Sequence, residues 1–249
     1  MSTSSEVLSP EHYYDAFEYS GRTMQTMHGA LAKLTLPCDI RESLQAIPEA
    51  NLLVLGSATA RNISNVALID KDIRPGQGHK DTVVIVDRNH YPMRKHREEW
   101  EWMRDVVRNE EQNRILPYPS FRFGQADMRQ LPMRDGTFDI VASDYTLNFL
   151  DTYEDVQQTF SEVQRVLKPG GILLAAVLGH SEVDPGIPVE SLANTTAEHS
   201  ERGTGPVTTL VHRFPLQFYT AAASEAGLAM RAADQNGNSY LCAVLQNED

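Results

Sequence analysis

Short apolar runs that stop at an acidic residue or a glycine recur along the chain and predict buried β-strands. These runs lie at 52–55, 82–86, 121–126, 138–144 and 172–177. Continuous apolar runs of this length are typical of strands covered on both faces, as in parallel sheets. The polar or glycine residues at their ends are Gly56, Asp87, Asp127 and Asp144.

Apolar residues at helical spacing fill the segments between these runs and predict helices. The clearest stripe consists of Val156, Phe160, Val163 and Leu167. We expect Thr152 and Asp155 to cap the start of this helix, and the helix to close in 167–171 at Pro169-Gly170-Gly171. Further helices are predicted within 13–34, 40–47, 60–69, 92–112 and 215–226.

The remaining segments predict a long loop and a terminal hairpin. Prolines and glycines break the pattern between 179 and 205, which indicates a lid or substrate loop without regular structure. Strands at 228–233 and 240–245 flank an Asn-Gly hairpin signal. We expect one domain over 1–249, with an N-terminal helical cap (1–47), a core (48–178), a lid (179–214) and a C-terminal helix and hairpin (215–249).

The residues at the strand ends predict a nucleoside site, because ligands of open parallel sheets bind at the carboxyl ends of the strands. A glycine turn after the first strand brings backbone N–H groups close to a ligand. Asp87 can accept hydrogen bonds from ribose hydroxyls, and Asp127 can accept one from an exocyclic amine such as that of adenine. Met128 offers an apolar surface to a purine. Taken singly, each carboxylate could equally cap a helix or face water.

Composition narrows the classes of function. The chain of 249 residues has 34 acidic and 22 basic residues, a formal charge of −12, which disfavours nucleic acid as a partner. Cys38 and Cys242 fit neither a disulfide framework nor a zinc site, so we expect two reduced, mostly buried thiols. The histidine spacing indicates no metal site. Lacking an apolar signal region and any long apolar run, the chain is expected to be soluble, unexported and cytoplasmic.

The motifs resemble those of class I S-adenosylmethionine-dependent methyltransferases, particularly the small-molecule group. The resemblance covers about 48–178 and, more weakly, 212–245. It is carried by the segments 52–61, 126–132, 136–141 and 167–171. It implies an α/β fold with a doubly wound, Rossmann-like sheet of seven strands, mostly parallel with the last strand antiparallel, and a helical cap.

The same resemblance implies a set of cofactor contacts. Gly56 would lie against the methionine part of S-adenosylmethionine, Asp87 would bind the ribose, and Asp127 with Met128 would hold the adenine. Asp144 and Tyr145 would line the rim beside the sulfonium. The full implied set is Gly56, Ser57, Ala58, Asp87, Arg88, Asp127, Met128, Asp144 and Tyr145.

Catalytic residues are harder to assign, because methyl transfer is an in-line displacement that depends mainly on positioning. A general base is needed only when the acceptor carries a proton. His180 is the leading candidate by position, although it also fits an ordinary loop histidine. The other candidates are Tyr13, Tyr14, Asn148 and His212.

The expected function is transfer of a methyl group to an O, N or C atom of a small-molecule acceptor. Val54 stands where the family usually has an acid, and Ala58 and Ala60 stand where it has glycines. These changes favour an alternative, a methyltransferase-like protein whose activity is lost or changed. A nicotinamide-dependent dehydrogenase is a weaker alternative, since Gly56-Ser57-Ala58-Thr59-Ala60-Arg61 lacks the G-x-G-x-x-G pattern.

Overall fold

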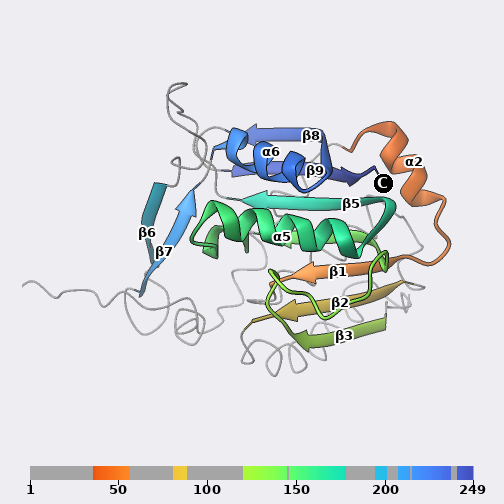
Figure 1. Cartoon of the computed structure of the whole chain (residues 1–249), viewed down its shortest axis with the longest axis horizontal. Coiled ribbons are helices and arrows are strands. Elements are labelled where there is room, and N and C mark those ends of the chain that lie inside the picture. The colour runs from red at the N-terminus through yellow and green to blue at the C-terminus, as the bar shows by residue number, and fades with distance from the viewer. Residues whose placement is uncertain are drawn as a thin grey trace, which may run out of the picture.

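The computed structural model describes residues 36–56, 81–88, 120–144, 146–177, 194–200, 207–213, 215–236 and 240–248. These residues form a seven-stranded sheet and a separate two-stranded sheet (Figure 1). The predicted helices within 13–34, 60–69 and 92–112 lie outside the described residues.

The large sheet has the strand order β3-β2-β1-β4-β5-β9-β8. The strands from β3 to β5 pair in parallel, whereas β9 is antiparallel to both of its neighbours, which confirms the predicted mixed sheet. The chain moves outward from β1 to β3 and returns on the other side of β1, so the order reverses between β1 and β4. The strands are β1 (Asn51–Leu55), β2 (Thr82–Asp87), β3 (Ser120–Gln125), β4 (Phe138–Asp144), β5 (Leu167–Val177), β8 (Leu228–Asn236) and β9 (Tyr240–Asn247).

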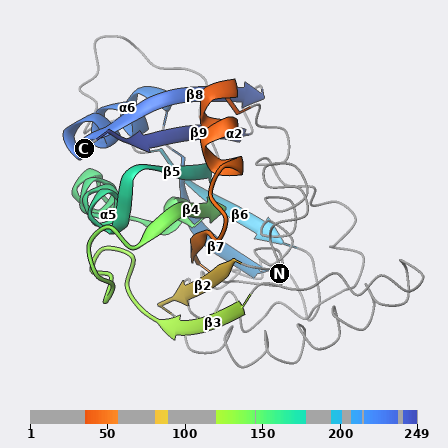
Figure 2. The ribbon, with the colours of Figure 1, turned by 90° about the vertical axis from the view of Figure 1, so that its right-hand side faces the viewer.

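Helices cover both faces of the sheet (Figure 2). Helices α5 (Tyr153–Val166) and α6 (Leu216–Glu225) contribute to one apolar cluster, and α2 (Cys38–Gln45) contributes to a second. In β1, alternate residues enter the two clusters: Leu53 and Leu55 join the first, and Leu52 and Val54 join the second. This two-sided burial explains the continuous apolar runs in β1 and β2.

Helix α5 begins as predicted but ends differently. Thr152 caps its first turn, since the Asp155 N–H donates to the Thr152 hydroxyl at 3.1 Å. The helix ends at Val166, and the segment 167–171, predicted to close it, is instead the start of β5. Phe138 of β4 pairs with Leu167 and Ile140 pairs with Ile172, so the segment between them bulges out of the ladder. Proline has no N–H and Gly170 has a φ of +76°, which suits a bulge.

The prediction of an unstructured loop at 179–205, within a lid at 179–214, is wrong in part. Strand β6 (Asn194–Ser200) pairs antiparallel with β7 (Val207–Arg213) in the two-stranded sheet. The prolines and glycines that suggested a loop lie before 194 and between 201 and 206, outside both strands. Turn signals at the ends of a strand were therefore mistaken for the absence of one.

The remaining elements lie close to their predicted positions. Helix α2 was expected at 40–47 and α6 at 215–226, and Gly227 after α6 has the predicted positive φ, at +80°. Strands β8 and β9 are longer than predicted. Cys38 is a free thiol but is exposed, which corrects the expectation of mostly buried thiols. Among the described helices, none is long and apolar enough to span a membrane.

Candidate functional site

The carboxyl ends of the five parallel strands β1 to β5 lie at one edge of the sheet, which we call the rim. The segments that follow β1 and β3 are both tied to the end of β2. The Gly56 N–H donates to the Val86 carbonyl at 2.8 Å, and the Ala126 N–H donates to the Asp87 carbonyl at 2.9 Å. The structure therefore brings the backbones of Gly56, Asp87 and Asp127 to one rim, and Gly56 lies next to the reversal of strand order between β1 and β4.

Gly56 makes a close contact with Thr146, a residue that sequence reasoning missed. Its φ is +77°, and a Cβ added at this position would lie 2.1 Å from the Thr146 Oγ1. That hydroxyl donates to the Leu55 carbonyl at 2.9 Å. Because the Gly56 N–H is already bonded to Val86, Gly56 contributes to the rim through its conformation and small size rather than as a donor.

Asp87 and Asp144, at the ends of β2 and β4, project toward the same face of the sheet. Side chains alternate between the two faces of a strand, so each lies on the face of the residue two positions before it. Both carboxylates are half-buried. The residues that fix this face, all in the α2 cluster, are Val83, Ile85, Ile140 and Ala142.

Asp127 is held by Arg129 in a paired contact. The Arg129 Nε donates to Asp127 Oδ1 at 3.0 Å, and its Nη2 donates to Oδ2 at 2.7 Å. The Arg129 Nη1 donates to Asp155 of α5 at 2.8 Å. Hydrogen bonds from Arg129 lower the pKa of Asp127 below its ordinary value, and the charge of Arg88 adds to the effect. Asp127 is thus an ionised acceptor at the rim.

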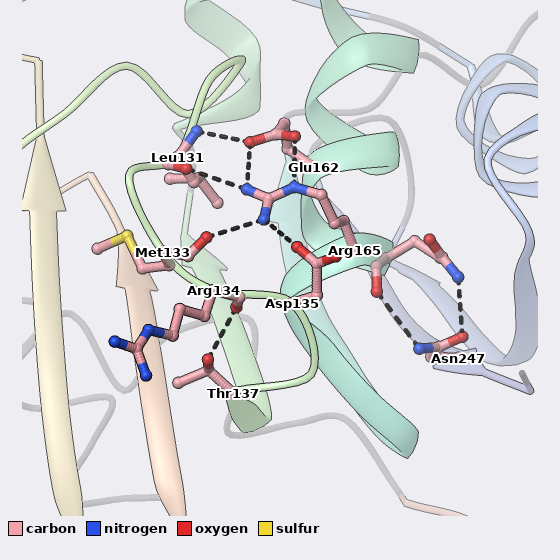
Figure 3. A network of polar contacts seen from close by, with 9 residues as sticks. Leu131, Met133, Arg134, Asp135, Thr137, Glu162, Arg165 and Asn247 are labelled. Carbon is pink, nitrogen blue, oxygen red and sulfur yellow. Dashed lines mark hydrogen bonds and ion pairs between the residues drawn. The ribbon is translucent and has the colours of Figure 1, made fainter.

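The segment 127–137 that carries Asp127 is also fastened to the far end of α5 (Figure 3). Glu162 accepts from the Leu131 N–H at 2.7 Å and pairs with the guanidinium of Arg165 at 2.8 Å. Arg165 also donates to the carbonyls of Leu131 and Met133, at 3.0 and 2.8 Å, and pairs with Asp135. Hydrogen bonds from Arg165 lower the pKa of Glu162. The segment therefore has anchors at both ends of one helix.

Two acidic residues near the amino ends of the parallel strands, opposite the rim, have a structural role. Asp81 and Asp139 are buried and accept the N–H groups of Ala50 and Asn51, each at 2.8 Å. The Lys168 ammonium lies 2.8 Å from both oxygens of Asp139. These contacts fix the start of β1, whereas Asp87, Asp127 and Asp144 remain partly exposed at the rim.

The candidate catalytic residues are not assembled by the described structure. Asn148 lies in the short 3-10 helix η5 (Leu147–Phe149) and is fully buried. His212 lies in β7, paired with Thr195. No cluster of three metal-ligand side chains occurs within the described ranges. The predicted site residues outside them are Tyr13, Tyr14, Ser57, Ala58, Tyr145 and His180.

Comparisons with known proteins agree with this arrangement. Residues 98–175 match the family described as a methyltransferase domain. The chain is 45% identical over 64 residues to the putative methyltransferase YqeM of Bacillus subtilis, which covers 25% of this chain and 26% of that protein. The chain thus spans about a quarter of that curated relative, and 42% of a second one.

Two solved structures share the fold. A SAM-dependent methyltransferase of Methanosarcina mazei matches with a TM-score of 0.56 and 15% identity, over 86% of this chain and 99% of that one. The 1,6-didemethyltoxoflavin-N1-methyltransferase of Burkholderia thailandensis, solved with S-adenosylhomocysteine bound, matches with a TM-score of 0.54 and 17% identity, over 95% and 84% of the two chains. The family match over 98–175 and the fold shared with these two structures make the chain similar to S-adenosylmethionine-dependent methyltransferases.

Proposed function

We propose that the protein transfers a methyl group from S-adenosylmethionine to an O, N or C atom of a small-molecule acceptor. The observation that carries the proposal is the joint placement of Gly56, Asp87 and Asp127 at one rim that includes the β1–β4 reversal of strand order, because open α/β sheets bind nucleotides at the carboxyl ends of their strands beside such a reversal. The acidic charge of the chain argues against nucleic acid as the acceptor, and its cysteine usage supports a cytoplasmic site of action.

The donors and acceptors at the rim fit the nucleoside part of this cofactor. Asp87 offers its carboxylate to the ribose hydroxyls, and Arg88 follows it at the end of β2. Asp127 is an acceptor, and the neighbouring Met128 N–H makes no hydrogen bond within the described part of the chain. An acceptor beside a free donor matches the amine and the N1 atom of adenine. The half-buried Met128 side chain packs on the α5 cluster beneath them.

The chemistry asks little of the protein beyond positioning. S-adenosylmethionine, when bound, supplies an electrophilic methyl group on its sulfonium. The rim residues would hold the nucleoside, and Asp144 at the end of β4 would line the neighbouring edge. Orientation of the acceptor and exclusion of water then account for the rate, without a covalent intermediate on the protein.

Binding of the cofactor and its product is the direct test. We expect mass spectrometry of the purified protein to detect co-retained S-adenosylmethionine or S-adenosylhomocysteine, and calorimetry to measure binding of both. Asp87→Ala should weaken this binding while leaving the fold intact, which circular dichroism checks. Asp234→Ala is the matched control, because Asp234 is an exposed carboxylate on β8, the strand at the opposite side of the sheet from β3. Unchanged affinity in Asp87→Ala would remove Asp87 from the site.

A further inference from the structure

We propose that Arg129 is a specificity-determining residue that restricts the rim to 6-aminopurine nucleosides and excludes 6-oxopurine ones. This inference rests on the proposed function and extends it to a residue that need not touch the ligand. Arg129 acts through Asp127, whose carboxylate it fixes in orientation and in its ionised form.

The hydrogen bonds around Asp127 leave little acceptor capacity for a ligand. Asp127 Oδ1 accepts both the backbone N–H and the Nε of Arg129, each at 3.0 Å. Oδ2 accepts the Arg129 Nη2 at 2.7 Å and lies 3.3 Å from Nε. Since a carboxylate oxygen has about two lone-pair sites, Oδ1 is saturated and Oδ2 has about one good site left. Asp127 therefore offers one further acceptor position in a fixed direction.

Arg129 cannot easily leave Asp127, because its third nitrogen is held by Asp155. Asp155 lies in the first turn of α5, the turn capped by Thr152. The side chains of Arg129 and Asp127 are 30% and 32% exposed, so the pair is shielded in part from water. A guanidinium bound by two carboxylates is a rigid support, and the planar fork of arginine suits this paired contact better than lysine would.

The rim presents a hydrogen-bond acceptor next to a donor, and a bound purine must present the complementary donor and acceptor. Oδ2 of Asp127 is an acceptor and the adjacent Met128 N–H is a donor. Adenine presents an amine and the acceptor N1, which complement this pair. A 6-oxopurine presents a carbonyl and N1–H, which is the reverse at both positions.

Arg129 makes this mismatch costly. Without it, Asp127 could rotate toward water or take up a proton and then donate to the carbonyl of a 6-oxopurine. With it, rotation breaks the paired contact and protonation is disfavoured. Selectivity between the two nucleosides is therefore a property of the Arg129–Asp127 pair rather than of Asp127 alone.

The test compares dissociation constants of S-adenosylhomocysteine and its 6-oxo analogue, S-inosylhomocysteine, by calorimetry. For the natural protein we expect the adenosine compound to bind at least about tenfold more tightly, because the 6-oxopurine places an acceptor against the acceptor Asp127 and a donor against the Met128 N–H, which leaves both without a hydrogen bond. Arg129→Gln should reduce this ratio several-fold, and Arg129→Lys should give an intermediate ratio. Arg134→Gln is the matched control: Arg134 is exposed in the same segment and its guanidinium makes no ion pair with described residues. This control should leave the ratio unchanged.

The outcomes separate this inference from the proposed function. Failure of the natural protein to bind either compound would overturn the proposed function itself. Equal binding of the two compounds would overturn the inference and leave the function standing. A variant Arg129→Gln that weakens both compounds equally would reduce Arg129 to a structural support, which also overturns the inference. Asp155→Asn replaces Arg129→Gln if that variant does not fold, since it loosens Arg129 without touching Asp127 and should lower the ratio by a smaller factor.

Discussion

Replacing Gly56 by alanine should strongly destabilise the protein, for two separate reasons. The backbone at Gly56 has a φ of +77°, a region that costs an L-residue about 1–2 kcal/mol. The new Cβ would also lie 2.1, 2.5 and 2.8 Å from the Oγ1, Cγ2 and Cβ of Thr146. Because the Thr146 Cβ is among these atoms, rotation of the side chain cannot relieve the clash, and the backbone must move.

The size of the effect follows from these contacts. Overpacking of a tight site costs about 1–3 kcal/mol, and displacement of Thr146 breaks its hydrogen bond to the Leu55 carbonyl, worth about 1 kcal/mol. Together with the strain in φ, we expect Gly56→Ala to lower the free energy of unfolding by about 3–6 kcal/mol, a large share of the roughly 5–15 kcal/mol of an ordinary domain.

Urea unfolding of a double-mutant cycle measures this coupling. Thr146→Ala removes the two closest atoms, so the double variant should cost less than the sum of the single ones, by about 1–3 kcal/mol. If Gly56→Ala costs less than about 1 kcal/mol, or if the two changes are additive within about 0.3 kcal/mol, the described contact does not constrain the rim.

Three further predictions concern stability. Asp139→Ala should lower the free energy of unfolding in urea by about 2–3 kcal/mol, because the buried carboxylate that accepts the Asn51 N–H and pairs with Lys168 is lost. The control Asp135→Ala, at a side chain that is 81% exposed, should lower it by at most about 0.5 kcal/mol. Equal losses in the two variants would contradict this prediction. Arg165 holds the folded-state pKa of Glu162 below its ordinary value of 4.5, so the Glu162 carboxylate stabilises the fold fully above that pH, and this stabilisation is lost as the pH falls through the folded-state pKa. Glu162→Gln should therefore make the free energy of unfolding depend less steeply on pH at the acid end of the curve. An unchanged slope would refute the prediction. Thr152→Ala should cost about 1 kcal/mol through loss of the α5 cap, seen in thermal unfolding, and Thr152→Ser should retain most of it.

The parallel half of the sheet could be predicted because its signal is local. A strand covered on both faces is a continuous apolar run, and the residue that ends it is visible at once, as at Asp87 and Asp144. The same reasoning failed for β6 and β7. These strands contain many polar residues, and the neighbouring prolines and glycines indicated a loop.

The candidate site was predictable only to the level of its strand-end residues. Asp87 and Asp127 were identified from position, since parallel strands place their carboxyl ends together. The contacts of Thr146 and Arg129 depend on partners 91 and 26 positions away, Leu55 and Asp155, which no local pattern encodes. Only the three-residue spacing of Glu162 and Arg165 on one helix was a readable signal.

The position of β9 bears on how the sheet is assembled. Among the described strands of the large sheet, β8 is hydrogen-bonded to β9 alone, while β9 also pairs with β5. Strand β8 therefore joins the sheet by pairing with β9, its neighbour in the sequence. The entropy cost of closing the short connection between them is small, which favours early pairing. The parallel strands are joined by long connections, so the entropy cost of loop closure must be met before their hydrogen bonds can form. The sheet is thus bordered on this side by two strands that are neighbours in the sequence, whereas its parallel part joins strands that are distant in the sequence.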